Sequence, residues 1–112
     1  MINKKDIISF NIEIGEKGEL HNESSLDFAL GIIKTRKSWL YELSYLARSL
    51  LVDHAFTDGN KRTALALVLT YFDDKGIECD KQKIAGIIHK ISKKSIKDIN
   101  KIMRLMKSGI IY

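Results

Sequence analysis

The chain has no proline, a single cysteine and no long apolar run. Without proline, the residue that most strongly breaks helices is missing, so long helices are permitted throughout. One cysteine, Cys79, cannot form an internal disulfide, which agrees with a reducing compartment. Charges interrupt every apolar run before it could span a bilayer, and the N-terminus has no apolar signal core. We therefore expect a cytoplasmic protein with no membrane contact.

Acidic residues are scarce in the last third of the chain. Residues 81–112 hold nine Lys or Arg and one acid, Asp98, whereas residues 1–80 carry a net charge of −3. A basic segment indicates either an anionic partner or a solvated lysine-rich face. The segment has one aromatic residue, Tyr112, and stacking on the bases of a nucleic acid usually needs several. We therefore favour the solvated face and expect no nucleic-acid partner.

Helical periodicity is what the sequence has in abundance. The 112 residues, of which 45% are hydrophobic, suffice for one domain and are too few for two. Apolar residues recur at helical spacing in five segments. These segments are 24–36, 39–53, 60–75, a fourth with Ile84, Ile87, Ile88 and Ile91, and a fifth with Ile96, Ile99, Met103 and Met106.

Several polar residues and glycines are placed to start or end these helices. Ser24 and Asp80 can cap the N-termini of the first and the fourth segment's helices, and Gly76 can end the helix of residues 60–75. Ser95, with Asp98 three residues on, resembles a capping box for the last helix. The N-terminal stretch of residues 7–14 fits a strand and a helix equally well.

The segment HAFTDGNKRTAL, residues 54–65, places many polar groups between two apolar helices. His54 continues the apolar stripe of the helix before it, which predicts that it points inward. The helix after it, residues 60–75, is apolar nearly all round and is expected to be central and buried on most sides. Lys61 and Arg62 fall in its first turn, where the helix dipole disfavours cations. Their presence there indicates that something negative lies nearby.

The start of this helix has the features of an anion site. Free backbone N–H groups and the dipole favour a bound phosphate, and Gly59 lets the backbone approach it closely. Asn60 can cap the helix or donate to a phosphate oxygen. Arg62 suits bidentate contact with a phosphate, and Lys61 adds a point charge.

The rest of the segment supplies other chemical groups. Asp58 is a hard oxygen ligand beside the anion site, as Mg²⁺ bound to a polyphosphate requires. His54 is the candidate general base, because histidine is the residue type most often used to accept a proton in catalysis. Phe56 is predicted to anchor the loop in the core. Each feature has an ordinary structural explanation, such as a core histidine or an Asp-Gly-Asn turn, but their combination favours a site.

The residues His54-x-Phe56-x-Asp58-Gly59-Asn60-x-Arg62 resemble the signature of the Fic/Doc (Fido) family. The Asn-Lys-Arg run is most similar to the Doc, or death on curing, branch. The segment from Gly18 to Leu26 and the isoleucine-patterned C-terminal helices are also similar. The resemblance implies that residues 1–112 form a single all-α Fido domain of about six helices around a buried central helix, with a helical N-terminus.

The resemblance also implies a mechanism. His54 would deprotonate a Ser or Thr hydroxyl of a target protein, Asp58 would hold Mg²⁺ on ATP, and Gly59, Asn60, Lys61 and Arg62 would bind the phosphates. Fic proteins transfer AMP, whereas Doc toxins act as kinases and transfer the terminal phosphoryl group. Leu65 stands where full Fic motifs have a second arginine. We therefore expect phosphoryl transfer, with AMPylation as the alternative.

The family further implies a toxin–antitoxin pair, in which a separate antitoxin silences the protein. Residues 34–39 lie where the family has its target-docking flap. A self-inhibiting helix motif has only a weak counterpart in Ser9 to Glu13, because Ile14 follows. Two other hypotheses remain: a Fido domain that binds nucleotide without turnover, and a small basic module that binds nucleic acid.

Overall fold

The computed structural model describes residues 2–35 and 37–112, and it contains six α-helices in that part of the chain. Isolated bridges join Leu20 to Phe56 and Cys79 to Ile110, and the described residues form no β-strand. The predicted all-α fold of about six helices is therefore confirmed. The helices are α1 Lys4–Glu13, α2 Glu23–Ile33, α3 Trp39–Leu51, α4 Asn60–Asp74, α5 Lys81–Lys94 and α6 Ile99–Ser108.

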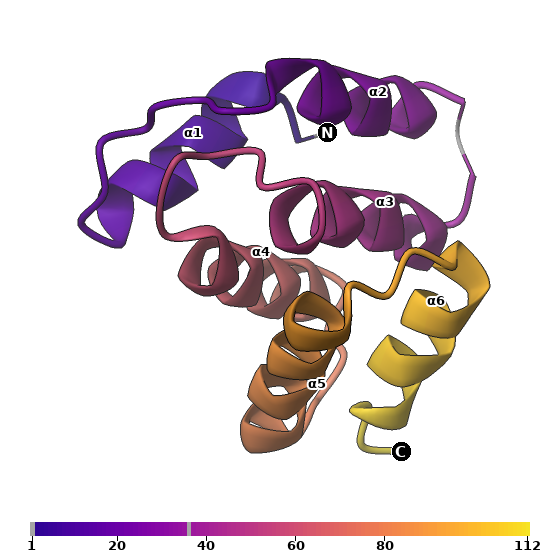
Figure 1. Cartoon of the computed structure of the whole chain (residues 1–112). Helices are drawn as coiled ribbons and strands as arrows, with labels where there is room; N and C mark the ends of the chain where they lie inside the picture. Colours follow the sequence, from indigo (N-terminus) through magenta and orange to yellow (C-terminus); the bar gives the residue numbers. More distant parts are fainter. Residues whose placement is uncertain (1, 36) are drawn as a thin grey trace.

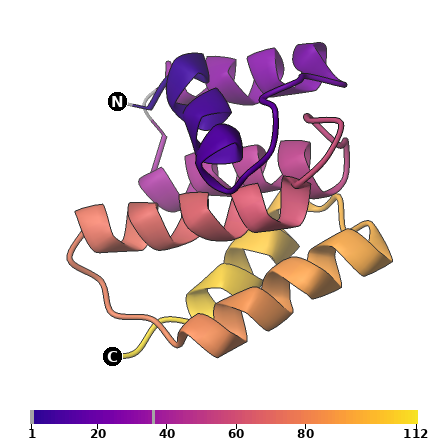
Figure 2. The same ribbon diagram turned by 90° about the vertical axis from the view of Figure 1, so that its left-hand side faces the viewer.

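The helices stack in three layers of two (Figures 1 and 2). The first layer holds α1 and α2, the second α3 and α4, and the third α5 and α6. The middle layer touches both others, since α3 packs against α2, α5 and α6, and α4 packs against α1 and α5. The N-terminal stretch, which fitted a strand as well as a helix, is the helix α1.

The most deeply buried helix is α3, which corrects the prediction that residues 60–75 form the central one. Leu43, Leu46 and Leu50 of α3 have no exposed surface, and eight residues of this helix are buried. Five residues of α4 are buried, while its last turn reaches solvent with Asp73 and Asp74. The apolar residues of α4 go all round the helix, but those on its outer side, such as Leu65 and Leu69, are only partly covered.

One predicted helix start and one predicted helix end are confirmed, and two predicted starts are wrong. Asp80 caps α5, and Gly76 follows α4 with a φ of +66°. The cap of α2 is Asn22 rather than Ser24, because the Asn22 side chain accepts a hydrogen bond from the Ser25 N–H. Ser95 ends α5 in a left-handed conformation, so it cannot begin α6.

The cap of α6 is Asp98, whose carboxylate accepts hydrogen bonds from the backbone N–H groups of Asn100 and Lys101. No helix in the described part of the chain is long and apolar enough to cross a membrane. The expected docking flap, residues 34–39, includes Arg36, which lies outside the described residues.

Candidate functional site

The loop of residues 52–59 joins α3 to α4 and carries most of the predicted site. His54 is exposed and has a φ of +53°, so the prediction that it points inward is wrong. The reason is local: α3 ends at Leu51, and the chain then turns through the left-handed region at His54. The next two residues, Ala55 and Phe56, are the ones that lie in the core and are buried. The imidazole is therefore directed to solvent, where a substrate can reach it.

Hydrogen bonds to the segment before α2 hold this loop in place. The Ala55 carbonyl accepts from the N–H groups of His21 and Asn22, at 2.7 and 3.1 Å. The Thr57 N–H donates to the Glu19 carbonyl at 3.0 Å. These bonds lie one and three residues after His54 and offset the cost of its backbone conformation, on the order of 1 kcal/mol or more for a residue other than glycine.

A serine pair fixes the start of the loop. The Ser25 hydroxyl lies 2.6 Å from the Asp53 carboxylate and 3.0 Å from the Ser49 hydroxyl. Ser25 belongs to α2 and Ser49 to α3, so the residue just before His54 is tied to two helices. The sequence offered no signal for this contact beyond the presence of small polar residues at inward helix positions.

Phe56 anchors the loop, as predicted, with its side chain 1% exposed. The Asn60 side chain makes two hydrogen bonds to the backbone of Phe56. Its oxygen accepts from the Phe56 N–H, and its nitrogen donates to the Phe56 carbonyl. Asn60 therefore braces the loop and does not cap α4, which corrects one of its two predicted roles. One N–H of its amide remains for a ligand.

Gly59 occupies the cap position of α4 with a φ of +76°, which L side chains rarely adopt. Among the six described helices, α4 is the one whose first turn receives no hydrogen bond from a capping side chain. The N–H groups of Asn60, Lys61 and Arg62 precede the first helical hydrogen bond, from Thr63 to Gly59 at 2.8 Å. These three donors and the helix dipole favour a negative group at this position.

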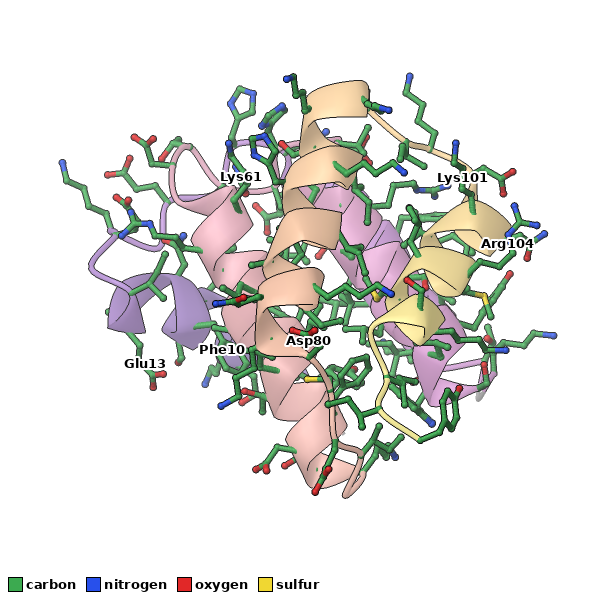
Figure 3. The ribbon with its side chains drawn as sticks, turned by 90° about the horizontal axis from the view of Figure 1, so that it is seen from below. Phe10, Glu13, Lys61, Asp80, Lys101 and Arg104 are labelled. Carbon is green, nitrogen blue, oxygen red and sulfur yellow. The ribbon has the colours of Figure 1, made fainter. Side chains whose placement is uncertain are left out.

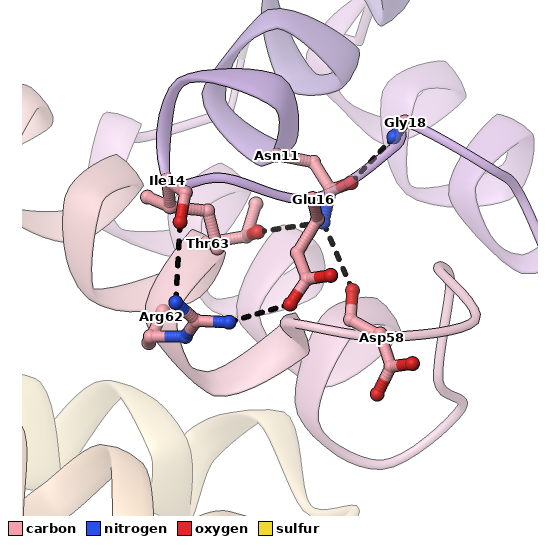
Figure 4. A network of polar contacts seen from close by, with 7 residues as sticks. All are labelled: Asn11, Ile14, Glu16, Gly18, Asp58, Arg62 and Thr63. Atoms are coloured by element: carbon pink, nitrogen blue, oxygen red, sulfur yellow. Dashed lines mark hydrogen bonds and ion pairs between the residues drawn. The ribbon is translucent and has the colours of Figure 1, made fainter.

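A side chain of this protein supplies the negative group beside one of the two cations, Arg62. Arg62 forms an ion pair with Glu16 and donates to the Ile14 carbonyl at 3.1 Å (Figure 4). Glu16 lies in the loop after α1, which crosses the start of α4. The Arg62 guanidinium has five N–H groups and uses two of them here, so the others remain for a phosphate.

Asn11, on the last turns of α1, is a site residue that sequence reasoning missed. Its buried side-chain nitrogen donates to the Asp58 carbonyl at 3.0 Å and the Thr63 hydroxyl at 3.1 Å (Figure 4). Its oxygen accepts from the Gly18 N–H at 2.8 Å. One amide thus joins the loop, the start of α4 and the segment after α1. The signal available was an asparagine at an inward position of the helix, between Ile7 and Ile14.

Asp58 and Lys61 have exposed side chains that make no hydrogen bond or ion pair with the described residues. Figure 3 shows Lys61 at the start of α4. The described residues contain no group of three His, Cys, Asp or Glu that could hold a metal ion by itself. A single free carboxylate does fit Mg²⁺ that is mostly held by nucleotide phosphates and water.

No family model, no curated protein and no solved structure matches this chain.

Proposed function

We propose that this chain is a Doc-like phosphotransferase of the Fic/Doc family, which moves the terminal phosphoryl group of ATP to a Ser or Thr hydroxyl of a target protein. The observation that carries the proposal is the uncapped start of α4, which follows an exposed histidine and an unpaired carboxylate in one braced loop. The family signature of residues 54–62 supplies the assignment of roles.

His54 acts as the general base. Its exposed imidazole accepts the proton of the target hydroxyl as the hydroxyl oxygen forms a bond to the γ-phosphorus. The bond from that phosphorus to the bridging oxygen breaks, and ADP leaves. The backbone hydrogen bonds of Ala55 and Thr57 support this role because they fix the chain just after His54 and leave the imidazole free.

The start of α4 binds the phosphates. The backbone N–H groups of Asn60, Lys61 and Arg62, together with the two cationic side chains, offset the negative charge of the triphosphate. Asp58 would hold Mg²⁺ on the nucleotide, and this ion would neutralise charge on the phosphate oxygens. Phe56 and Asn60 keep these groups in register by fixing the loop to the core.

Leu65 favours phosphoryl transfer over AMP transfer. It lies about one turn after Arg62 and packs against the core, partly buried. It therefore supplies no positive charge to a second phosphate. We also propose that a separate antitoxin silences the protein, so that the chain expressed alone in its own host arrests growth and the His54→Ala variant does not.

The test uses purified protein, host lysate, Mg²⁺ and ATP labelled on either the α or the γ phosphate. We expect label on a protein band from the γ position alone, and none with His54→Ala, which lacks the base. The matched control is His89→Ala, which removes an exposed histidine from α5 and should leave labelling unchanged.

Label arriving from the α position would replace phosphoryl transfer by AMP transfer. No label from either position, with wild type and His54→Ala alike, would contradict the enzyme hypothesis and favour a domain that binds nucleotide without turnover. Salt-sensitive binding of DNA or RNA that survives His54→Ala would favour the basic module instead.

A further inference from the structure

A cavity of about 500 Å³ opens at the opposite end of α4 from the site described above. It lies between α1, the first turn of α3 and the last turns of α4. Because α4 has fifteen residues, the two ends are roughly 20 Å apart. The volume falls in the range of about 300–1,000 Å³ that is usual for small-molecule sites.

The walls of the cavity combine aromatic rings with carboxylates. Phe10, Trp39 and Tyr71 supply the rings, one from each of α1, α3 and α4. Trp39 is held by an edge-to-face contact with Phe72, at 5.6 Å between ring centroids. Helical spacing brings one or two carboxylates to the same face as each ring, three or four residues away. These carboxylates are Asp6 and Glu13 beside Phe10, Glu42 beside Trp39, and Asp74 beside Tyr71.

The cavity is negative, although the chain as a whole has a net charge of +5. Its lining holds four carboxylates and one ammonium group, that of Lys75. Glu13, Glu42 and Asp74 make no ion pair or hydrogen bond through their side chains within the described ranges 2–35 and 37–112. The basic residues of α6, such as Lys101 and Arg104, lie on another side of the molecule (Figure 3).

Two pKa shifts agree with this description. Burial raises the pKa of the Glu42 carboxyl, and the positive charge of Lys75 lowers it by less. Burial, together with the negative charges of Glu42 and Asp74, raises the pKa of Tyr71 to about 12. The Tyr71 hydroxyl thus lies in a negative environment that a cation would relieve.

We propose that this cavity binds a linear organic polycation, an aliphatic chain that carries two or more primary ammonium groups. Ammonium groups pair with the separate carboxylates and lie against the faces of the aromatic rings, while the methylene groups between them cover apolar wall. A metal ion fits less well, because no three acidic groups among the described residues are close enough to hold one. The proposal does not depend on phosphotransfer.

Trp39 is the only tryptophan of the chain, so all tryptophan emission comes from the wall of this cavity. The test is a titration of the full chain with spermidine at about 0.15 M salt, where weak surface attraction is screened. We expect a saturable change in Trp39 emission. Glu42→Gln and Asp74→Asn should each weaken binding about tenfold, the effect of losing one charge-assisted hydrogen bond.

The matched control is Asp73→Asn, which removes the same charge from the neighbouring residue, outside the cavity lining. It should leave the affinity nearly unchanged, and the melting temperature of each variant shows that it folds. A second titration with an end-blocked lysine-rich tetrapeptide identifies the source of the ammonium groups. Tighter binding of spermidine indicates a free polyamine, and tighter binding of the peptide indicates lysine side chains of a polypeptide; both support the site.

Three results would overturn the proposal: no saturable change with either probe, equal weakening by Asp73→Asn, or the same emission change from Mg²⁺ at a lower concentration.

Discussion

Single residues determine the exposure of His54 and the position of the loop that carries the candidate site. The left-handed backbone of His54 turns its side chain to solvent, and the buried neighbours Ala55 and Phe56 keep it there. Asn60 closes the loop on Phe56, and Asn11 joins that loop to α1. Arg62 is shared between the anion site and Glu16. The charge state of that pair therefore affects how strongly the site attracts phosphate.

Removing the charge of Glu16 should strengthen nucleotide binding. In the Glu16→Gln variant the Arg62 guanidinium loses its ionic partner and becomes free for phosphate. An exposed ion pair contributes up to about 1 kcal/mol, so we expect ATP to bind about three- to fivefold more tightly. Isothermal titration calorimetry measures this change. Glu19→Gln, an exposed residue of the same segment, is the control. Unchanged or weaker binding in Glu16→Gln would contradict competition for Arg62.

Glu42 should make stability depend on pH. Burial raises its pKa above the ordinary value of 4.5, so the folded state disfavours the ionised form. The stability that protonated Glu42 contributes is complete below the unfolded pKa and is lost as pH rises through the folded pKa. Lys75, Asp74 and the Tyr71 hydroxyl share its cavity, and Lys75 opposes this loss in part.

We therefore expect Glu42→Gln to melt at a higher temperature than the wild type at pH 7, with the difference vanishing below the ordinary pKa of a glutamate. Thermal unfolding followed by circular dichroism measures the melting temperatures of Glu42→Gln and the wild type at each pH. A lower melting temperature for Glu42→Gln at pH 7 would mean that Lys75 outweighs burial.

At the scale of elements, the start of α4 and the end of α1 form one unit. The loop after α1 lies against Gly59, so that a Cβ there would come within 2.6 Å of the Glu16 Cγ and 3.0 Å of the Ile14 Cδ1. A side chain at position 59 would therefore push this loop away from Arg62. Gly76, at the other end of α4, has the same left-handed conformation with nothing within 4 Å of a Cβ.

The two glycines make a matched pair for experiment. Gly76→Ala should lower the free energy of unfolding by about 1–2 kcal/mol, the cost of a left-handed alanine. Gly59→Ala should cost roughly 1–3 kcal/mol more because of the contacts with the loop after α1. Urea denaturation measures both. Equal losses at the two positions would show that the loop moves aside freely.

At the scale of the molecule, the three layers depend on α3. This helix contacts α2, α4, α5 and α6 and contributes eight buried residues. The site loop leaves its C-terminal end, and the negative cavity is lined by its first turn. Weakening α3 should therefore affect both ends of the protein together.

Leu46→Ala should lower the free energy of unfolding by about 2–5 kcal/mol, because the removed side chain leaves a space in a fully buried position. Leu30→Ala, at a partly buried position of α2, should cost less. Urea unfolding followed by Trp39 fluorescence and by circular dichroism should give coincident transitions. Separate transitions for the two signals would show that the layers unfold independently.

The sequence by itself determined the helical class, most helix positions and which residues form the polar loop between α3 and α4. Periodic apolar residues select helices through contacts only three or four positions apart, and Phe56 and Gly59 act locally. The helix boundaries needed the structure, because Asn22 and Ser24 are both good caps, as are Ser95 and Asp98. The choice depends on which side chain reaches a free N–H.

Only the tertiary structure decided which helix is central, where His54 points and what lies beside Arg62. Glu16 and Arg62 are 46 positions apart, and Asn11 and Asp58 are 47 apart, so no local pattern signals their contact. The negative cavity has the same origin, because its carboxylates lie on three helices and each one alone looks like an ordinary surface acid. Such features depend on how the layers pack, and packing is decided by the whole chain at once.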